Sequence, residues 1–145
     1  MILTTERHKL TDIAEVERAR NGIIYPAGTI YIQVSATQGY IEILQKPGPI
    51  ETKYATIIPK IEISAAYFKI ALERCAPEFL ARYKSTINIQ MGDFQFFEVD
   101  IHPDKKTQHE IVAIMNQCEI AEKAEADIVD TLKECKRIAL AKMMC

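Results

Sequence analysis

The sequence has no long apolar run and no closely spaced cysteine pair. No stretch approaches the ~20 apolar residues of a membrane span, and residues 1–9 lack the basic-then-apolar order of a signal peptide. No cysteines form a CxxC motif, which argues against a zinc site or a thioredoxin-like site. We therefore expect a cytoplasmic protein without a metal, in which Cys75, Cys118, Cys135 and Cys145 are free thiols.

An excess of positive charge is also missing. The 145 residues carry 18 Lys and Arg against 20 Asp and Glu, so the net charge is −2 and the pI is about 5.9. A small, generally basic nucleic-acid binder would often have a pI above ~9, and the composition argues against that class. It leaves room for a basic patch on one face of the protein.

Catalytic motifs are absent as well. The sequence contains no GxGxxG, no GxxxxGK(S/T) and no GxSxG, and its three histidines and scattered acids form no acid–base pair. Glu51-Thr52-Lys53 matches the second half of a nuclease motif, but the nearest preceding aspartate is the distant Asp12. We predict a non-catalytic chain that uses no cofactor.

The residues up to about 106 predict an α+β domain with a mixed β-sheet, and the length fits one domain with its own core. Thr29–Ser35 and Tyr40–Gln45 alternate apolar and polar residues on either side of a turn, which is typical of a β-hairpin. Residues 53–58 predict a further strand that ends at Pro59.

Two short helices and two more strands complete the expected domain. Ser64 is a plausible N-cap for the first helix, and Pro77 suits the first position of a second one. Residues 86–90 predict a short strand, and residues 98–101 look extended.

The tail predicts one long helix. Residues 104–142 contain no Gly and no Pro, and Thr107 with Glu110 fits the spacing of a capping box. Apolar or small residues then recur in steps of three and four, with Glu125 at a core position, which favours a heptad seam. The seam comprises Ile111, Ile114, Cys118, Ala121, Ile128, Leu132 and Cys135. About 35 helical residues span ~50 Å, more than a 106-residue domain can cover, so the helix requires a partner.

Ile101–Lys105 contains the His-Pro-Asp tripeptide of J-domain co-chaperones. In those proteins the tripeptide lies between two antiparallel helices, whereas here it follows an alternating, strand-like segment. We interpret it as a strand-to-helix junction, in which Pro103 ends the strand and Asp104 caps the helix.

Polar side chains at the strand edges are the candidate DNA contacts. Amides and hydroxyls with occasional lysines suit base edges and phosphates, although each residue singly fits an ordinary solvent-facing strand position. The candidates are Gln33, Ser35, Thr37, Gln38, Lys53, Tyr54, Lys60, Lys84, Asn88 and Gln90.

Three segments resemble one half of a type I restriction–modification specificity (S) subunit. Lys9–Ile13 is similar to the family's KLGDI start, with Thr11 in place of the usual Gly. Ile101–Gln108 resembles the family's IPLPxxxxQ segment, with His102 as a departure. Leu132–Met143 resembles the end of the family's long helix, LKxxKxxLLxKMF.

The resemblance implies a target-recognition domain, residues 1–106, and a helix, residues 107–145, for dimerisation and docking. A full S subunit has two such domains separated by two antiparallel helices, and it recruits methyltransferase (modification) subunits and, in some systems, a restriction subunit. A homodimer of this chain would restore that arrangement. It would then read a split palindrome in double-stranded DNA, while methylation and cleavage belong to other subunits.

A second reading stays open. The chain could dock modification or specificity subunits as a regulator or decoy without reading DNA. Residues 1–106 carry 13 basic and 13 acidic residues, so the domain has no net charge to attract DNA. Residues 107–145 carry 5 basic and 7 acidic residues, so the net negative charge lies in the helix.

Overall fold

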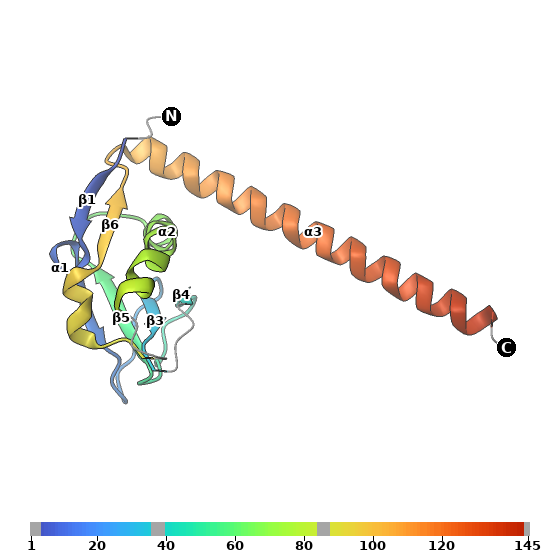
Figure 1. Cartoon of the computed structure of the whole chain (residues 1–145), viewed down its shortest axis with the longest axis horizontal. Coiled ribbons are helices and arrows are strands. Elements are labelled where there is room, and N and C mark those ends of the chain that lie inside the picture. The colour runs from blue at the N-terminus through green and yellow to red at the C-terminus, as the bar shows by residue number, and fades with distance from the viewer. Residues whose placement is uncertain (1–3, 36–39, 84–87, 144–145) are drawn as a thin grey trace. The chain divides into compact units, whose positions relative to one another are not determined.

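The computed structural model describes residues 4–35, 40–83 and 88–143. The chain divides into two compact units, Met1–His109 and Glu110–Cys145. No helix within the described ranges is long and apolar enough to cross a membrane. The order of elements confirms the α+β class with a long C-terminal helix, as Figure 1 shows.

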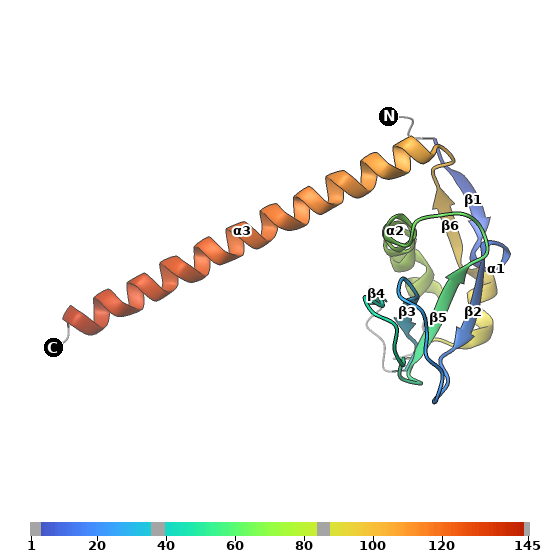
Figure 2. The same ribbon diagram turned by 180° about the vertical axis from the view of Figure 1, so that it is seen from behind.

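A four-stranded sheet is the centre of the first unit, in the order β2-β5-β3-β4. Its strands are β2 (Ala14–Arg18), β3 (Ile30–Gln33), β4 (Ile41–Ile43) and β5 (Tyr54–Pro59). The described strand pairs are all antiparallel rather than mixed. The predicted hairpin of residues 29–45 is confirmed, because Ile30 pairs with Ile43 and Ile32 with Ile41. Figure 2 shows β5 lying between β2 and β3.

The remaining strands, β1 (Glu6–Lys9) and β6 (Glu98–Ile101), form a separate antiparallel pair. The four-residue helix α1 (Leu10–Ile13) links β1 to β2, and its Leu10 N–H donates to the Phe97 carbonyl at 2.8 Å. The 3-10 helix η1 (Met91–Phe96) leads into β6. Of the strand expected at residues 86–90, only residues 88–90 belong to the described part of the chain.

The core lies on one face of the four-stranded sheet, where α2 (Ala65–Tyr83) packs. The alternation of β3 explains this, because Ile30 and Ile32 are fully buried while Tyr31 and Gln33 on the opposite face are half-buried. Tyr67, Phe68 and Leu72 supply the buried side of α2. Ser64 caps this helix as predicted, since its Oγ accepts from the Tyr67 N–H at 3.2 Å.

The prediction that Pro77 starts a second short helix is wrong. α2 is one 19-residue helix that contains Pro77. Proline inside a helix removes one hydrogen bond and costs about 3 kcal/mol. Burial on both sides of Pro77 offsets that cost, because Ala76 and Phe79 are in the core and the Phe79 ring lies 4.5 Å from the Phe97 ring, centroid to centroid.

The strand-to-helix junction is confirmed, but the capping box at Thr107 is wrong. The last helix, α3 (Lys105–Met143), begins directly after Asp104. The Asp104 carboxylate accepts from the Thr107 N–H at 3.3 Å and from the Thr107 hydroxyl at 2.7 Å. Thr107 is therefore inside the first turn and buried, and Asp104 is the capping residue.

Candidate nucleic-acid interface

Four of the predicted contact residues meet where β3 ends and β5 begins. Gln33 pairs with Tyr54 across the two strands. The Val34 and Ser35 N–H groups both donate to the Lys53 carbonyl, at 2.8 and 3.3 Å. Gln33, Ser35, Lys53 and Tyr54, which are separated by about twenty residues in the sequence, therefore form one surface.

Arg18 also belongs to this surface, although it is not among the contacts predicted from the sequence. Its Nη2 donates to the Ser35 hydroxyl at 2.9 Å, and its Nε donates to the Thr52 carbonyl at 2.8 Å. The side chain remains exposed, so the guanidinium presents a positive charge beside the polar strand ends. No spacing in the sequence singles out Arg18, because its place beside Ser35 depends on the order of the strands.

Lys53 provides a second positive charge within the surface. Its Nζ lies 3.3 Å from a Glu51 carboxylate oxygen and 5.5 Å from the centre of the Tyr54 ring. Because the ion pair is exposed, the attraction between Lys53 and Glu51 is weak and easily exchanged for a phosphate.

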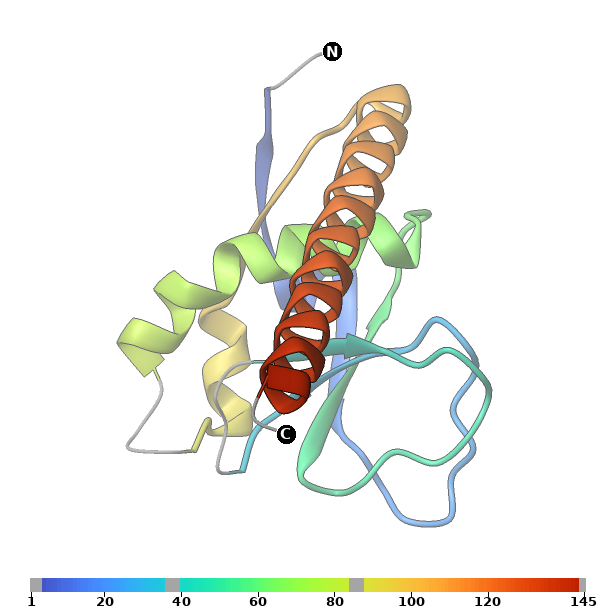
Figure 3. The same cartoon turned by 90° about the vertical axis from the view of Figure 1, so that its right-hand side faces the viewer.

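Tyr54 contributes to packing as well as to this surface. Its ring lies edge-on to the Tyr31 ring, with centroids 5.0 Å apart. Both rings pack against a small cluster of Ala19, Tyr25 and Ile50. This cluster joins the two loops that precede β3 and β5, which run side by side through the Tyr25–Gly48 bridge (Figure 3). Burial raises the pKa of Tyr31, so its hydroxyl is neutral near neutral pH.

Asn88 and Gln90 lie near the same strand end. The N–H of the intervening Ile89 donates to the Val34 carbonyl at 2.9 Å, and this bond holds residues 88–90 against the end of β3. Ile89 is buried while Asn88 and Gln90 are exposed. Two more amide side chains therefore border the surface formed by Arg18 and Lys53.

Lys60 is separated from the other candidates. It follows the opposite end of β5, and its Nζ donates to the Thr11 carbonyl at 3.0 Å. Seven residues of extended chain place it about 23 Å from Lys53. The predicted contacts Thr37, Gln38 and Lys84 lie outside the described residues.

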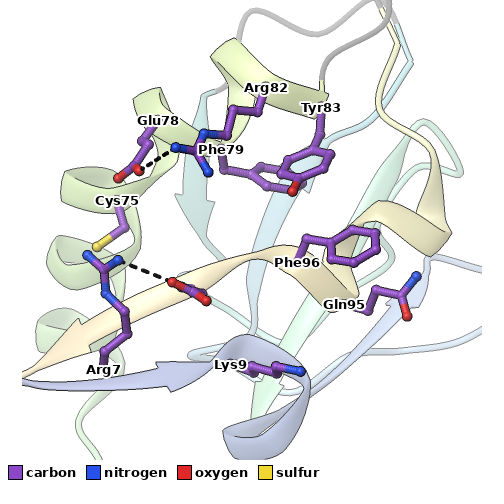
Figure 4. A pocket seen from close by; sticks show the side chains of 10 residues that line it. Arg7, Lys9, Cys75, Glu78, Phe79, Arg82, Tyr83, Gln95 and Phe96 are labelled. Carbon is purple, nitrogen blue, oxygen red and sulfur yellow. Dashed lines mark hydrogen bonds and ion pairs between the residues drawn. The ribbon is translucent and has the colours of Figure 1, made fainter.

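A separate shallow pocket of about 140 Å³ lies between β1, α2 and η1 (Figure 4). Phe96, 51% exposed, stacks on Tyr83 with ring centroids 5.2 Å apart. The arginines at its rim are paired within the domain: Arg7 with Glu98 and Asp100, and Arg82 with Glu78. The Arg7 guanidinium lowers the pKa of Asp100, so this ion pair persists into acid.

The structure thus combines a domain that has a polar surface at one sheet end with a long helix that exposes apolar side chains. The chain belongs to the type I restriction modification DNA specificity domain family, whose model matches residues 13–134. As predicted, this family supplies the recognition part of a restriction–modification complex and not its catalysis. No curated protein matches the sequence.

Solved structures of this group share the fold at low sequence identity. The S subunit of a type I restriction–modification system from M. genitalium matches with a TM-score of 0.66 and 14% identity, over 80% of this chain and 40% of that one. A chain from a study of complex assembly and conformational transition in the type I R-M system matches with a TM-score of 0.73 and 14% identity, over 95% of this chain and 44% of that one. The HsdS subunit of Thermoanaerobacter tengcongensis matches with a TM-score of 0.64 and 14% identity, over 86% of this chain and 39% of that one. This chain therefore spans about two fifths of their length.

Proposed function

We propose that this chain is a half specificity subunit that reads one half of a split DNA site. Two copies, joined through α3, present two identical domains to two identical half-sites, so the target is a split palindrome. The dimer recruits methyltransferase subunits, and a restriction subunit where the system has one. The chain selects the DNA sequence, and its partners carry out the reactions.

The surface at the ends of β3 and β5 carries this proposal. Arg18 and Lys53 supply exposed positive charges for phosphates. Asn88 and Gln90 present exposed amides, the type of side chain that bonds adenine and other base edges in the major groove. The Gln33 amide lies beside them, and its Nε2 donates to the Ser35 carbonyl at 2.8 Å. Charge and amide groups thus meet on one side of a domain that has no overall positive charge.

The homodimer is supported by the surface of α3. Ile128 is 60% exposed and Leu132 is 63% exposed in the single chain. A second copy would cover these side chains and supply the second domain.

The first experiment finds the DNA target and then tests the surface. The chain is co-expressed with the host's modification subunit, and sequencing of the methylated bases is expected to reveal a split palindrome. Affinity for that DNA is then measured against salt concentration, and phosphate contacts give a clear negative slope.

Arg18→Ala and Lys53→Ala are each expected to weaken binding and to reduce the salt slope by about one. Lys123→Ala, a substitution on α3, serves as the matched control and is expected to leave the slope unchanged. Lys60→Ala shows whether the far end of β5 takes part. Unchanged affinity in both the Arg18 and Lys53 variants would contradict this surface assignment.

The second candidate function is docking without DNA recognition. The balanced charge of residues 1–106 favours it, because such a domain gains little general attraction to DNA. A flat salt slope with the modification subunit bound would support this regulator or decoy and would exclude the DNA-reading proposal.

A further inference from the structure

The stripe of small and apolar residues along α3 carries information about how two copies pair. The stripe repeats in alternating steps of three and four residues from Ile111 to Lys142. Its members within the second unit are exposed or half-buried, so the single chain leaves the stripe uncovered. The inference below rests on the homodimer proposed above and specifies its register.

Alternating steps restrict an antiparallel pairing to a few registers. In an antiparallel pair, each three-residue interval of the stripe on one helix must lie opposite a three-residue interval on the other helix. In any other register the side chains of the stripe no longer meet at the seam. The allowed registers therefore differ by seven residues. One of them uses the whole stripe, since it places Ile111 opposite Lys142 of the second copy.

In this register the layers of the seam combine residues of complementary size. The layers pair Ile114 with Ala139, Cys118 with Cys135, Ala121 with Leu132, and Glu125 with Ile128 of the second copy. Ile114 and Leu132 each meet an alanine, and the two mid-sized cysteines meet one another. In the Ile114–Ala139, Cys118–Cys135 and Ala121–Leu132 layers no two large residues meet and no two alanines meet, so the helices can pack closely at these layers.

A parallel pairing lacks this complementarity. Each residue would face its own copy, so Ala121 would leave a gap while Ile128 would crowd. Glu125 would also face Glu125, and Lys142 would face Lys142, at the same level of the seam. Like charges in direct contact at a seam are unfavourable.

The two neighbouring antiparallel registers are also less favourable. A shift of seven residues in one direction would bring Ile128 and Leu132 into one layer and would leave Ala121 opposite Ala139. A shift in the other direction would place Ala121 opposite Glu125, would bring Ile114 and Leu132 into one layer, and would place Glu122 beside its own copy at the flank of the seam. In the full-length register Glu122 instead lies beside Val129, and no flanking pair carries like charges.

We propose that two copies pair antiparallel in the full-length register, so that Cys118 of each chain lies opposite Cys135 of the other. The dimer then contains two symmetry-related thiol pairs. Each cysteine lies about 25 Å from its own copy, far beyond the reach of a disulfide. The only disulfide that these two cysteines can form in the dimer joins Cys118 of one chain to Cys135 of the other.

Thiol cross-linking of the full chain tests the register. Every variant carries Cys145→Ser, so that the terminal thiol cannot react. After mild oxidation, or with a short bismaleimide linker, the Cys145→Ser chain is expected to run as a covalent dimer. Cys118→Ser and Cys135→Ser are each expected to reduce that dimer at least ten-fold, and mixing the two single variants is expected to restore a link.

The matched control keeps the number of thiols on the helix. Asp130→Cys combined with Cys118→Ser moves one thiol to the side of α3 away from the stripe, and no cross-link is expected. Two single variants that both still form cross-links through their remaining cysteine would indicate parallel pairing and would overturn the proposal.

Light scattering separates the register from the dimer itself. If the chain is a dimer but the 118–135 link does not form, the register is wrong and the homodimer stands. If only monomer is present at micromolar concentration, the homodimer and its register are both overturned.

Discussion

His102 is a buried histidine whose hydrogen bonds connect three segments of the domain. The Tyr67 hydroxyl accepts from the His102 backbone N–H at 2.8 Å and lies 2.7 Å from the His102 Nδ1. The Gln108 side chain donates to the His102 carbonyl at 2.7 Å. These bonds tie α2, the end of β6 and the first turn of α3 together, and they serve structure rather than catalysis.

The pH dependence of stability follows from this residue. Burial, aided by the positive charge of Arg74, lowers the pKa of His102 below its usual 6.5. Below pH 6.5 the unfolded chain binds a proton that the folded chain does not bind. The stability from His102 is therefore complete above pH 6.5 and decreases as the pH falls toward the lowered pKa.

Urea unfolding at about pH 7.5 and about pH 5.5 measures this loss. We expect His102→Gln to flatten the change in the free energy of unfolding between the two values. His109→Gln, a substitution at an exposed histidine, is the control and is expected to preserve it. The pKa values of Asp100 and Asp104 are lowered from their usual 3.8. These carboxyl groups therefore change the stability only at a pH more acidic than either pH of the unfolding measurement. An unchanged pH dependence in His102→Gln would contradict the assignment.

At the scale of elements, α2 shows tertiary packing prevailing over local preference. Pro77 leaves the carbonyl of Glu73 without its usual helical donor, yet the helix continues to Tyr83. The Phe79 ring explains this, because it packs against Phe94 and Phe97 at centroid distances of 5.6 and 4.5 Å. Aromatic burial of this kind contributes several kcal/mol and holds the second half of the helix in line.

Pro77→Ala is therefore expected to stabilise the domain. The substitution restores a donor to the interior of a continuous helix, and a gain of about 1–3 kcal/mol in the free energy of unfolding should follow. Urea denaturation measures it, with the nearby exposed Ala81→Ser as a control for a change in side chain alone. A neutral or destabilising result would indicate that the helix is divided at Pro77.

At the scale of the whole molecule, the two units have different chemistry. The domain buries most of its apolar residues and carries balanced charge, while the second unit, residues 110–145, exposes large apolar side chains and carries the net negative charge. Large exposed apolar surface of this extent marks an interaction site. The chain thus combines a folded domain with a helix whose apolar side chains are left uncovered.

Leu132→Glu tests the dependence of the dimer on this helix. A further carboxylate in the seam, one layer from Glu125 of the second copy in the proposed register, is expected to convert the dimer to monomer at micromolar concentration, because it would be desolvated beside a like charge. Light scattering measures the mass, and circular dichroism checks that the helix content of the domain remains. Lys133→Ala, one residue away and outside the stripe, should leave the dimer intact; equal masses for the two variants would exclude the seam from the interface.

The sequence by itself determined the elements whose signal is local. Alternation in residues 29–35 and 40–45 specifies a hairpin, and the steps of three and four after residue 107 specify a helix with an uncovered stripe. Only the tertiary structure decided the rest. Arg18 reaches Ser35 because β5 inserts between β2 and β3. Helix α2 continues through Pro77 because the Phe79 ring packs against Phe94 and Phe97. Contacts between distant segments depend on strand order and core packing, which no local spacing encodes.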